Sequence, residues 1–143
     1  MGARRERLAC GGGTPHTYAV ILTDTRYADV VVLALKGRLD QATAEGVRTE
    51  LAPFLARCAA GQDHVVLDLT AVDYVSSAGL RVFMLAAKQA KAQQGYLALV
   101  EVQPLVQEIL EISKFTLILK ILPSVRDALV ESSSAGLAAF ETR

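Results

Sequence analysis

Short β-branched runs alternate with segments of helical periodicity along this chain, and that alternation constrains the fold more than any other feature. A helix that separates two strands usually carries the chain across a sheet, so that the strands run parallel. The first two runs instead follow each other across a short polar turn, which is typical of an antiparallel hairpin. Strands are therefore predicted over 18–23, 30–36, 64–69, 96–100 and 115–122.

The helical segments are recognised by apolar residues that repeat every three or four positions. In the first of them Val47 and Leu51 begin such a stripe, and Pro53 is expected to kink the helix or to end its first half. Pro104 suits the first turn of a later helix, and Ser124 suits the cap of the last one. Helices are predicted over 43–58, 77–93 and 105–112, with a short final helix after Ser124.

Together these elements predict an α/β fold in the order β-β-α-β-α-β-α-β-α. Its mixed sheet should hold four to five strands, mostly parallel with one antiparallel edge, packed with about four helices. The run at 64–69 is nearly all apolar and should be a central strand buried on both faces. We predict one domain over 18–131, between a flexible leader at 1–17 and a tail at 132–143. The tail should fray, although Leu137 and Phe140 are able to dock back.

The composition excludes several classes of protein. Of 143 residues, 52% are apolar and 21% are charged, which suits a folded domain rather than a disordered chain. Fifteen basic and fifteen acidic residues cancel, unlike in a general nucleic-acid binder or a polybasic membrane anchor. No apolar run is long enough to span a bilayer. Cys10 and Cys58 are too few for a disulfide framework or a cysteine zinc site. We therefore predict a cytoplasmic protein that binds neither nucleic acid nor metal.

Motifs of the common enzyme classes do not occur in the sequence. It has no nucleophile elbow, phosphate-binding glycine loop, dinucleotide fingerprint or zinc-protease helix. A serine hydrolase needs a base beside its serine, and His64 is the only histidine of the predicted domain. It begins the buried strand, whereas Ser77 follows the far end of that strand, roughly 15 Å away. We therefore predict that the chain is not an enzyme and holds no cofactor.

The segment from Asp68 to Arg81 links the buried strand to the second predicted helix. It follows the carboxyl end of a strand, where open α/β sheets usually place their sites. Ser76 and Ser77 occupy the cap of the helix, and serine is a favoured cap because its oxygen accepts a backbone N–H. Gly79 costs up to ~1 kcal/mol in a helix relative to alanine, so its presence suggests that a partner or a phosphate approaches the backbone. A plain cap and a functional serine both explain this pattern.

Phosphorylation of a serine at this position would act as a switch. The phosphoryl group adds about −1.5 to −2 charges at pH 7. Free N–H groups and the helix dipole favour that charge by about 0.3–1 kcal/mol. A partner docked on the same spot would instead have to desolvate a dianion. Phosphorylation would therefore change binding without refolding the chain.

Three motifs resemble those of the STAS domain of bacterial anti-sigma factor antagonists, and the resemblance covers about residues 18–131. GRLD at 37–40, followed by Thr43, is similar to the family's G-x-L-D-x-x-T motif. VVLDL at 65–69 is similar to its V-V-L-D-L strand, and YVSSAGL at 74–80 to its phosphorylation loop. The predicted order of strands and helices is also that of the family. Asp68, the aspartate of the second motif, is expected to be structural and to tie the strand end to the loop.

The resemblance implies roles for individual residues. In the family's usual loop, I-D-S-[S/T]-G-L, the serine after the aspartate is phosphorylated, and that serine corresponds to Ser77. Ser76 stands in place of the aspartate and becomes a minor alternative acceptor. Asp40 and Thr43 are expected at the partner-binding surface, as caps of the first helix, or both. The partner-binding residues that the resemblance implies are Asp40, Thr43, Ser76, Ala78, Gly79 and Leu80.

The resemblance also implies partner switching by a monomer. The unphosphorylated chain would bind an anti-sigma factor, which is also a serine kinase of histidine-kinase-like ATPase fold, and free the sigma factor. That kinase would phosphorylate Ser77 and leave, and a PP2C-type phosphatase would reset the chain. ATP and Mg²⁺ belong to the kinase. Two alternatives stay open: a non-switching STAS subunit of a transport or stressosome-like assembly, and a detached anion-transporter domain, against which the absence of a transmembrane segment argues.

Overall fold

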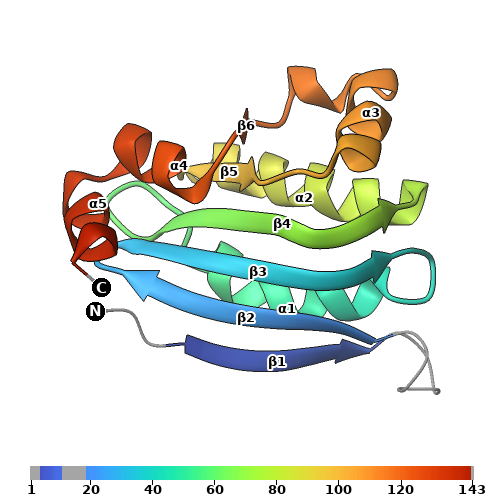
Figure 1. The fold of residues 1–143 in the computed structure, drawn as a ribbon, viewed down its shortest axis with the longest axis horizontal. Helices are drawn as coiled ribbons and strands as arrows, with labels where there is room; N and C mark the ends of the chain where they lie inside the picture. The colour runs from blue at the N-terminus through green and yellow to red at the C-terminus, as the bar shows by residue number, and fades with distance from the viewer. Residues whose placement is uncertain (1–3, 11–18, 143) are drawn as a thin grey trace.

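The computed structural model describes residues 4–10 and 19–142 and contains one mixed sheet with helices on both faces (Figure 1). Six strands lie side by side in chain order, from β1 to β6. β2 is antiparallel to both of its neighbours, and every later pair is parallel. The strands are β1 (Arg4–Cys10), β2 (Ala19–Tyr27), β3 (Val30–Leu39), β4 (His64–Val75), β5 (Leu97–Val100) and β6 (Ile121–Leu122).

The helices follow the strands as the alternation of the sequence predicts, and the predicted fold class is confirmed. α2 begins at Ser77, the residue predicted, and ends one residue before the predicted end. α1 continues through Pro53 to Ala56, so Pro53 does not end the helix, although its missing N–H costs α1 one backbone hydrogen bond. The helices are α1 (Ala44–Ala56), α2 (Ser77–Ala92), α3 (Pro104–Ile112), the 3₁₀ turn η1 (Phe115–Leu117), α4 (Val125–Ser132) and α5 (Ser134–Glu141).

Two hydrophobic clusters lie on opposite faces of the sheet, because successive residues of a strand point to opposite sides. Val31, Leu33 and Leu35 of β3 join the cluster that α1, α2 and α3 cover. Val30 and Val32 join a smaller cluster under α4 and α5. In β4 the residues Val65, Val66, Leu67 and Leu69 are all fully buried, which confirms that this strand is central and covered on both faces.

Two predicted segments differ from the structure. Residues 4–10, part of the predicted flexible leader, form β1 and pair with β2 along its whole length; residues 11–17 lie outside the described part of the chain. The apolar run at 115–122 was predicted as a strand but forms η1, a turn and the two-residue β6. β5 is short and pairs with β6 only through Leu99 and Val100. Few backbone N–H and C=O groups of β5 are therefore available to pair with the segment 115–122. Apolar character alone does not separate a strand from a turn.

The predicted C-terminal tail folds into α5 instead of fraying. Ser133 caps this helix, because its Oγ accepts the N–H of Gly136 at 2.9 Å. A Cβ at Gly136 would lie 2.8 Å from Cγ2 of Val30, so the glycine lets α5 approach the sheet closely. Leu137 and Phe140, the residues expected to dock, pack against the smaller cluster. Within the described residues, no helix is both long and apolar enough to cross a membrane.

Candidate functional site

The carboxyl ends of β3 and β4 lie side by side at one end of the sheet, and α1 and α2 begin beside them (Figure 1). We call this region, residues 37–43 with 74–81, the carboxyl end. The N–H of Ser76 donates to the carbonyl of Leu39 at 2.8 Å and so fixes the β4–α2 connection to the end of β3. The motifs GRLD and YVSSAGL, which are more than thirty positions apart in the sequence, are therefore neighbours in space.

Asp40 and Thr43 shape the turn between β3 and α1. The Thr43 hydroxyl donates to the carbonyl of Arg38 at 2.7 Å and accepts the N–H of Asp40 at 3.0 Å. Oδ1 of Asp40 accepts the N–H groups of Ala42 and Thr43 at 2.9 and 3.2 Å. Thr43 occupies the N-cap position of α1 without a side-chain capping bond and is only 1% exposed. The buried Thr43 side chain therefore stabilises the turn, while the half-buried Asp40 side chain remains partly accessible to a partner.

Ser76 and Ser77 have different environments although they are adjacent. Ser76 is the N-cap of α2, and its Oγ accepts the N–H of Gly79 at 3.4 Å. Ser77 is the first residue of the helix and is exposed. Among the residues that the structure describes, no hydrogen-bond partner is found for the Ser77 hydroxyl. The serine that the resemblance marks for phosphorylation is therefore the accessible one, and its neighbour is the cap.

Gly79 has a packing role that the sequence did not reveal. A Cβ there would lie 2.9 Å from Cγ1 of Val75 and 3.0 Å from both the Cβ and the carbonyl oxygen of Leu39. The glycine therefore lets the first turn of α2 sit against the ends of β3 and β4. The space expected for a partner or a phosphate is filled by the chain itself. Gly79 and Leu80 are buried, whereas Ala78 is half-buried.

A groove of about 1000 Å³ opens beside Ser77, between α1 and α2, and extends to Ser113 and Phe115 beyond α3. Ser77 and Ala78 lie at its wall, and so do two arginines that the sequence analysis did not single out, Arg48 of α1 and Arg81 of α2. Arg81 follows Ser77 by four positions, a spacing that places both on one helix face. That spacing was visible in the sequence, whereas the approach of Arg48 depends on how α1 packs on α2.

His64 occupies the place expected for it at the start of β4, but Asp68 does not lie at a strand end. The predicted strand stopped at residue 69, whereas β4 continues to Val75, so Asp68 lies within the strand. His64 opens the strand, eleven positions before its last residue, and its Nδ1 lies 3.3 Å from Oδ2 of Asp29. It therefore lies at the far end of β4 from Ser77 and is not placed to act as a base for that serine. Oδ1 of Asp68 accepts the N–H and the hydroxyl of Thr70 at 3.0 and 2.6 Å, a structural contact. No group of three or more potential metal ligands occurs among the described residues.

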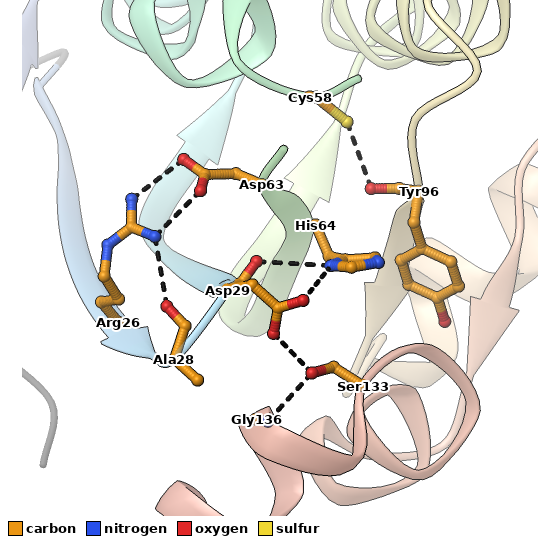
Figure 2. Close-up of polar contacts among 9 residues, drawn as sticks. All are labelled: Arg26, Ala28, Asp29, Cys58, Asp63, His64, Tyr96, Ser133 and Gly136. Atoms are coloured by element: carbon orange, nitrogen blue, oxygen red, sulfur yellow. Dashed lines mark hydrogen bonds and ion pairs between the residues drawn. The ribbon is translucent and has the colours of Figure 1, made fainter. Parts of the chain in front are cut away.

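The opposite end of the strands carries a network of polar contacts (Figure 2). We call this region, residues 26–29 with 57–64, 95–96 and 133–136, the hairpin end. Asp63 accepts hydrogen bonds from both ends of the Arg26 guanidinium at 2.9 Å and one from Arg57 at 3.1 Å. The bonds from Arg26, and then those from Arg57, hold the pKa of Asp63 below its ordinary value against the effect of burial. Asp29 contacts His64 on one side and accepts a hydrogen bond from Ser133 on the other.

Cys58 lies in the same region and is fully buried behind the end of α1. Its Sγ donates to the carbonyl of Tyr96 at 3.2 Å (Figure 2). Burial raises the pKa of the Cys58 thiol to about 11, so the thiol stays protonated at neutral pH. Since the thiolate is the reactive form, this cysteine is a packing residue.

The fold and the carboxyl end define an α/β domain that presents an exposed serine at the start of a helix, at the wall of a groove. A family model for the STAS domain matches residues 22–128. The chain belongs to the STAS domain family. A protein of Bordetella bronchiseptica, provisionally named as the anti-sigma factor antagonist BtrV, is 42% identical over 121 residues, which are 85% of this chain and 95% of that protein.

Solved structures agree with this assignment. A crystal structure of an anti-sigma factor antagonist from Mycobacterium paratuberculosis superposes with a TM-score of 0.69 at 19% identity, over 78% of this chain and 92% of that one. The antagonist SpoIIAA in its unphosphorylated form gives a TM-score of 0.60 at 16% identity, over 76% and 92% of the two chains. The Bacillus SpoIIAA in its phosphorylated form gives 0.56 at 15%, over 76% and 96%. At these identities the structural matches establish the fold.

Proposed function

We propose that this chain is an anti-sigma factor antagonist whose binding to its anti-sigma factor is controlled by phosphorylation of Ser77. The observation that carries the proposal is the exposed Ser77 hydroxyl, which has no partner among the described residues and lies at the wall of a groove on a STAS fold. The similarity to the Bordetella relative, which is named as an antagonist, supports it. So does the similarity to SpoIIAA, an antagonist whose structure is known in both the unphosphorylated and the phosphorylated form.

The first turn of α2 is suited to carry a phosphoryl group. Ser77 and Ala78 are the first two residues of the helix, so their N–H groups have no carbonyl of the preceding turn to bond. The positive end of the helix dipole lies at the same place and favours a dianion by about 0.3–1 kcal/mol. The modified chain should therefore keep its fold. A partner that covers Ser77 would instead lose affinity, because it would bury an unpaired charge.

The surface beside Ser77 is suited to a protein partner. Phe115 and Leu85 line the groove, and Leu85 is 37% exposed. Ile112 and Leu117, which flank Phe115 in the chain, are 74% and 80% exposed. Apolar surface of this kind marks interaction sites on soluble domains. The partner we propose is an anti-sigma factor with the ATPase fold of a histidine kinase, which supplies ATP and Mg²⁺ and transfers the γ-phosphoryl group to Oγ of Ser77. A PP2C-type phosphatase would reverse the step.

The test is a capture experiment from a lysate of the native host, followed by calorimetry on the protein captured. The baits are the unmodified chain, Ser77→Ala, Ser77→Asp, the chain with phosphoserine installed at position 77, and Ser76→Ala as the matched control. We expect the kinase to bind the unmodified chain, Ser77→Ala and Ser76→Ala. Phosphoserine should weaken binding at least about tenfold, which corresponds to about 1.4 kcal/mol. Equal capture by all baits would refute the switch and favour a non-switching assembly subunit.

A further inference from the structure

Arg81 is an exposed arginine beside the proposed modification site. It lies on α2, one helical turn after Ser77, and both residues line the same groove. No ion pair or hydrogen bond of its guanidinium is found within the described part of the chain. Every other arginine of 19–142 forms at least one ion pair there, for example Arg48 with Glu45 at 3.3 Å and Arg126 with Glu141 at 3.3 Å.

We propose that Arg81 binds the phosphoryl group of a Ser77 that has been phosphorylated, and thereby acts as a positioning residue of the switch. This inference rests on the proposed function. Residues four positions apart on a helix have Cβ atoms about 5–6 Å from each other. Side chains of a helix lean toward its N-terminus, so Arg81 leans toward Ser77 rather than away from it. The guanidinium fork matches two phosphate oxygens at once, which a lysine cannot do.

Arg48 is a weaker candidate for the same role. It lines the groove from α1, on the other side from Arg81. Its guanidinium already contacts Glu45, with Nε 3.3 Å from one carboxylate oxygen and Nη2 3.4 Å from the other. A phosphoryl group would have to compete with that carboxylate for Arg48, whereas no carboxylate of the described residues pairs with Arg81. We therefore expect Arg81 to bind the phosphoryl group more strongly than Arg48 does, and this order can be measured.

The consequence is that one phosphorylation event changes two charges on the docking surface. Before modification, Arg81 is a cation beside the groove with no ion-pair partner among the described residues, and it is available to an acidic group of the partner. After modification, the same guanidinium is engaged by the new phosphoryl group. The partner then meets a dianion and also loses a cation that it could have paired. An aspartate at position 77 carries a single charge on a shorter side chain, so Ser77→Asp should imitate phosphorylation incompletely.

The test uses the full chain with phosphoserine installed at position 77 during translation, so that it does not depend on any kinase. The second pKa of the phosphoryl group, ordinarily about 6, is read by ³¹P NMR titration. Arg81→Gln should raise it by about 0.2–0.4 of a pH unit, the size expected for a helical ion pair of this spacing. Arg48→Gln should raise it less. Lys88→Gln, an exposed cation of the same helix two turns further on, is the matched control and should leave it unchanged.

Each result of the titration either supports or overturns the proposed role of Arg81. A pKa that moves with Arg81→Gln, recovers in part with Arg81→Lys and is insensitive to Lys88→Gln supports the proposal. Equal values for Arg81→Gln and Lys88→Gln would overturn it, and so would a larger effect of Arg48→Gln than of Arg81→Gln. Arg81 is exposed, so its variants should fold, and thermal unfolding of the unphosphorylated forms checks this. Failure of the kinase to modify or release the chain would count against the proposed function alone, because the NMR titration is independent of it.

Discussion

The two ends of the sheet use polar residues in opposite ways. At the hairpin end, Asp63 is bonded by Arg26, and Asp29 by His64 and Ser133 (Figure 2). Arg57 donates a further hydrogen bond to Asp63. These contacts join segments that are far apart in the sequence, up to 104 positions for Asp29 and Ser133. At the carboxyl end, the polar groups inside the turn are bonded, but Ser77 and Arg81 face the groove without a partner of their own among the described residues.

The difference indicates which end is built for stability and which for binding. A buried carboxylate with three hydrogen bonds stabilises the fold only while all its partners are in place. An exposed hydroxyl contributes little to the free energy of folding, so it can be modified without unfolding the chain. If this division is right, substitutions at the hairpin end should lower the free energy of unfolding, whereas the key substitution at the carboxyl end should change binding and leave folding almost intact.

The largest effect on stability is expected at the hairpin end, for Gly95→Ala. A Cβ there would lie 2.2 Å from the carbonyl oxygen of Cys58 and 2.8 Å from the N of Ala59, so backbone would have to move. We expect a loss of about 3 kcal/mol, the upper part of the range for overpacking. Urea denaturation at constant m-value measures it.

Gly79→Ala is the matched control at the carboxyl end. Its new Cβ would lie 2.9–3.0 Å from its nearest neighbours, and alanine gains up to about 1 kcal/mol of helix propensity there. Its net cost should stay near ~1 kcal/mol or less. Similar losses for the two glycines would contradict the proposed contrast between the ends.

Asp63→Asn should have the second largest effect. The carboxylate is buried and lies between Arg26 and Arg57, and its replacement weakens three charge-assisted bonds, so we expect a loss of about 2 kcal/mol. The effect should depend on pH. The pKa of Asp63 is lowered in the folded state, so its stabilisation is present above the unfolded pKa near 3.9 and is lost as the pH falls further.

The measurement is the free energy of unfolding between pH 7 and pH 2. The difference between the unmodified chain and Asp63→Asn should be constant above about pH 5 and shrink below about pH 4. Asp73→Asn, at an exposed position near the carboxyl end of β4, is the control and should show a difference close to zero. A difference that grows toward low pH would show that the sign of the linkage is wrong.

Ser133→Ala should have a smaller and more local effect. It removes the cap of α5 and the hydrogen bond to Asp29, at a cost of about 1 kcal/mol. Because α5 is the last element of the chain, its release should not unfold the sheet. Amide hydrogen exchange should therefore accelerate in α5 and stay unchanged in α2. Faster exchange at the start of α2 would mean that the two ends are coupled.

How much the sequence predicts also differs between the ends. At the carboxyl end the signals are local: the start of α2 and the placement of both serines in its cap follow from capping chemistry within a few residues of Ser77, although β4 extends six residues beyond its predicted end. The roles of Thr43 and Gly79 were harder to predict, because each is decided by atoms of another element, the carbonyl of Arg38 and the side chain of Val75. The position of Arg81 relative to Ser77 was predictable from its spacing, but the absence of an ion pair for it among the described residues was not.

At the hairpin end almost every contact is long-range, and the sequence predicts little of it. The docking of α5 requires Gly136 to meet Val30 and Ser133 to meet Asp29, pairs that no local pattern links. For the same reason a flexible leader is predicted where β1 forms: its first four residues are charged, and only pairing with the edge of β2 makes a strand of the segment. Local chemistry therefore predicts the candidate site better than it predicts the supporting scaffold, because a helix start is a local structure and a packed terminus is not.

The smallest effect on stability is expected for Ser77→Ala, and this variant separates the roles of the two adjacent serines. Ser77 is exposed and its hydroxyl has no partner among the described residues, so the free energy of unfolding should change by less than about 0.5 kcal/mol. Ser76→Ala removes the capping bond to Gly79 and should cost about 0.5–1 kcal/mol, toward the low end for a cap because that bond is long, at 3.4 Å. For the effect of phosphorylation on partner binding the order is reversed, since only the loss of Ser77 should abolish it. The opposite result, in which Ser76→Ala abolished that effect and Ser77→Ala destabilised the fold, would exchange the two assignments. Ser77 would then be the cap of α2, and Ser76 would be the switch residue.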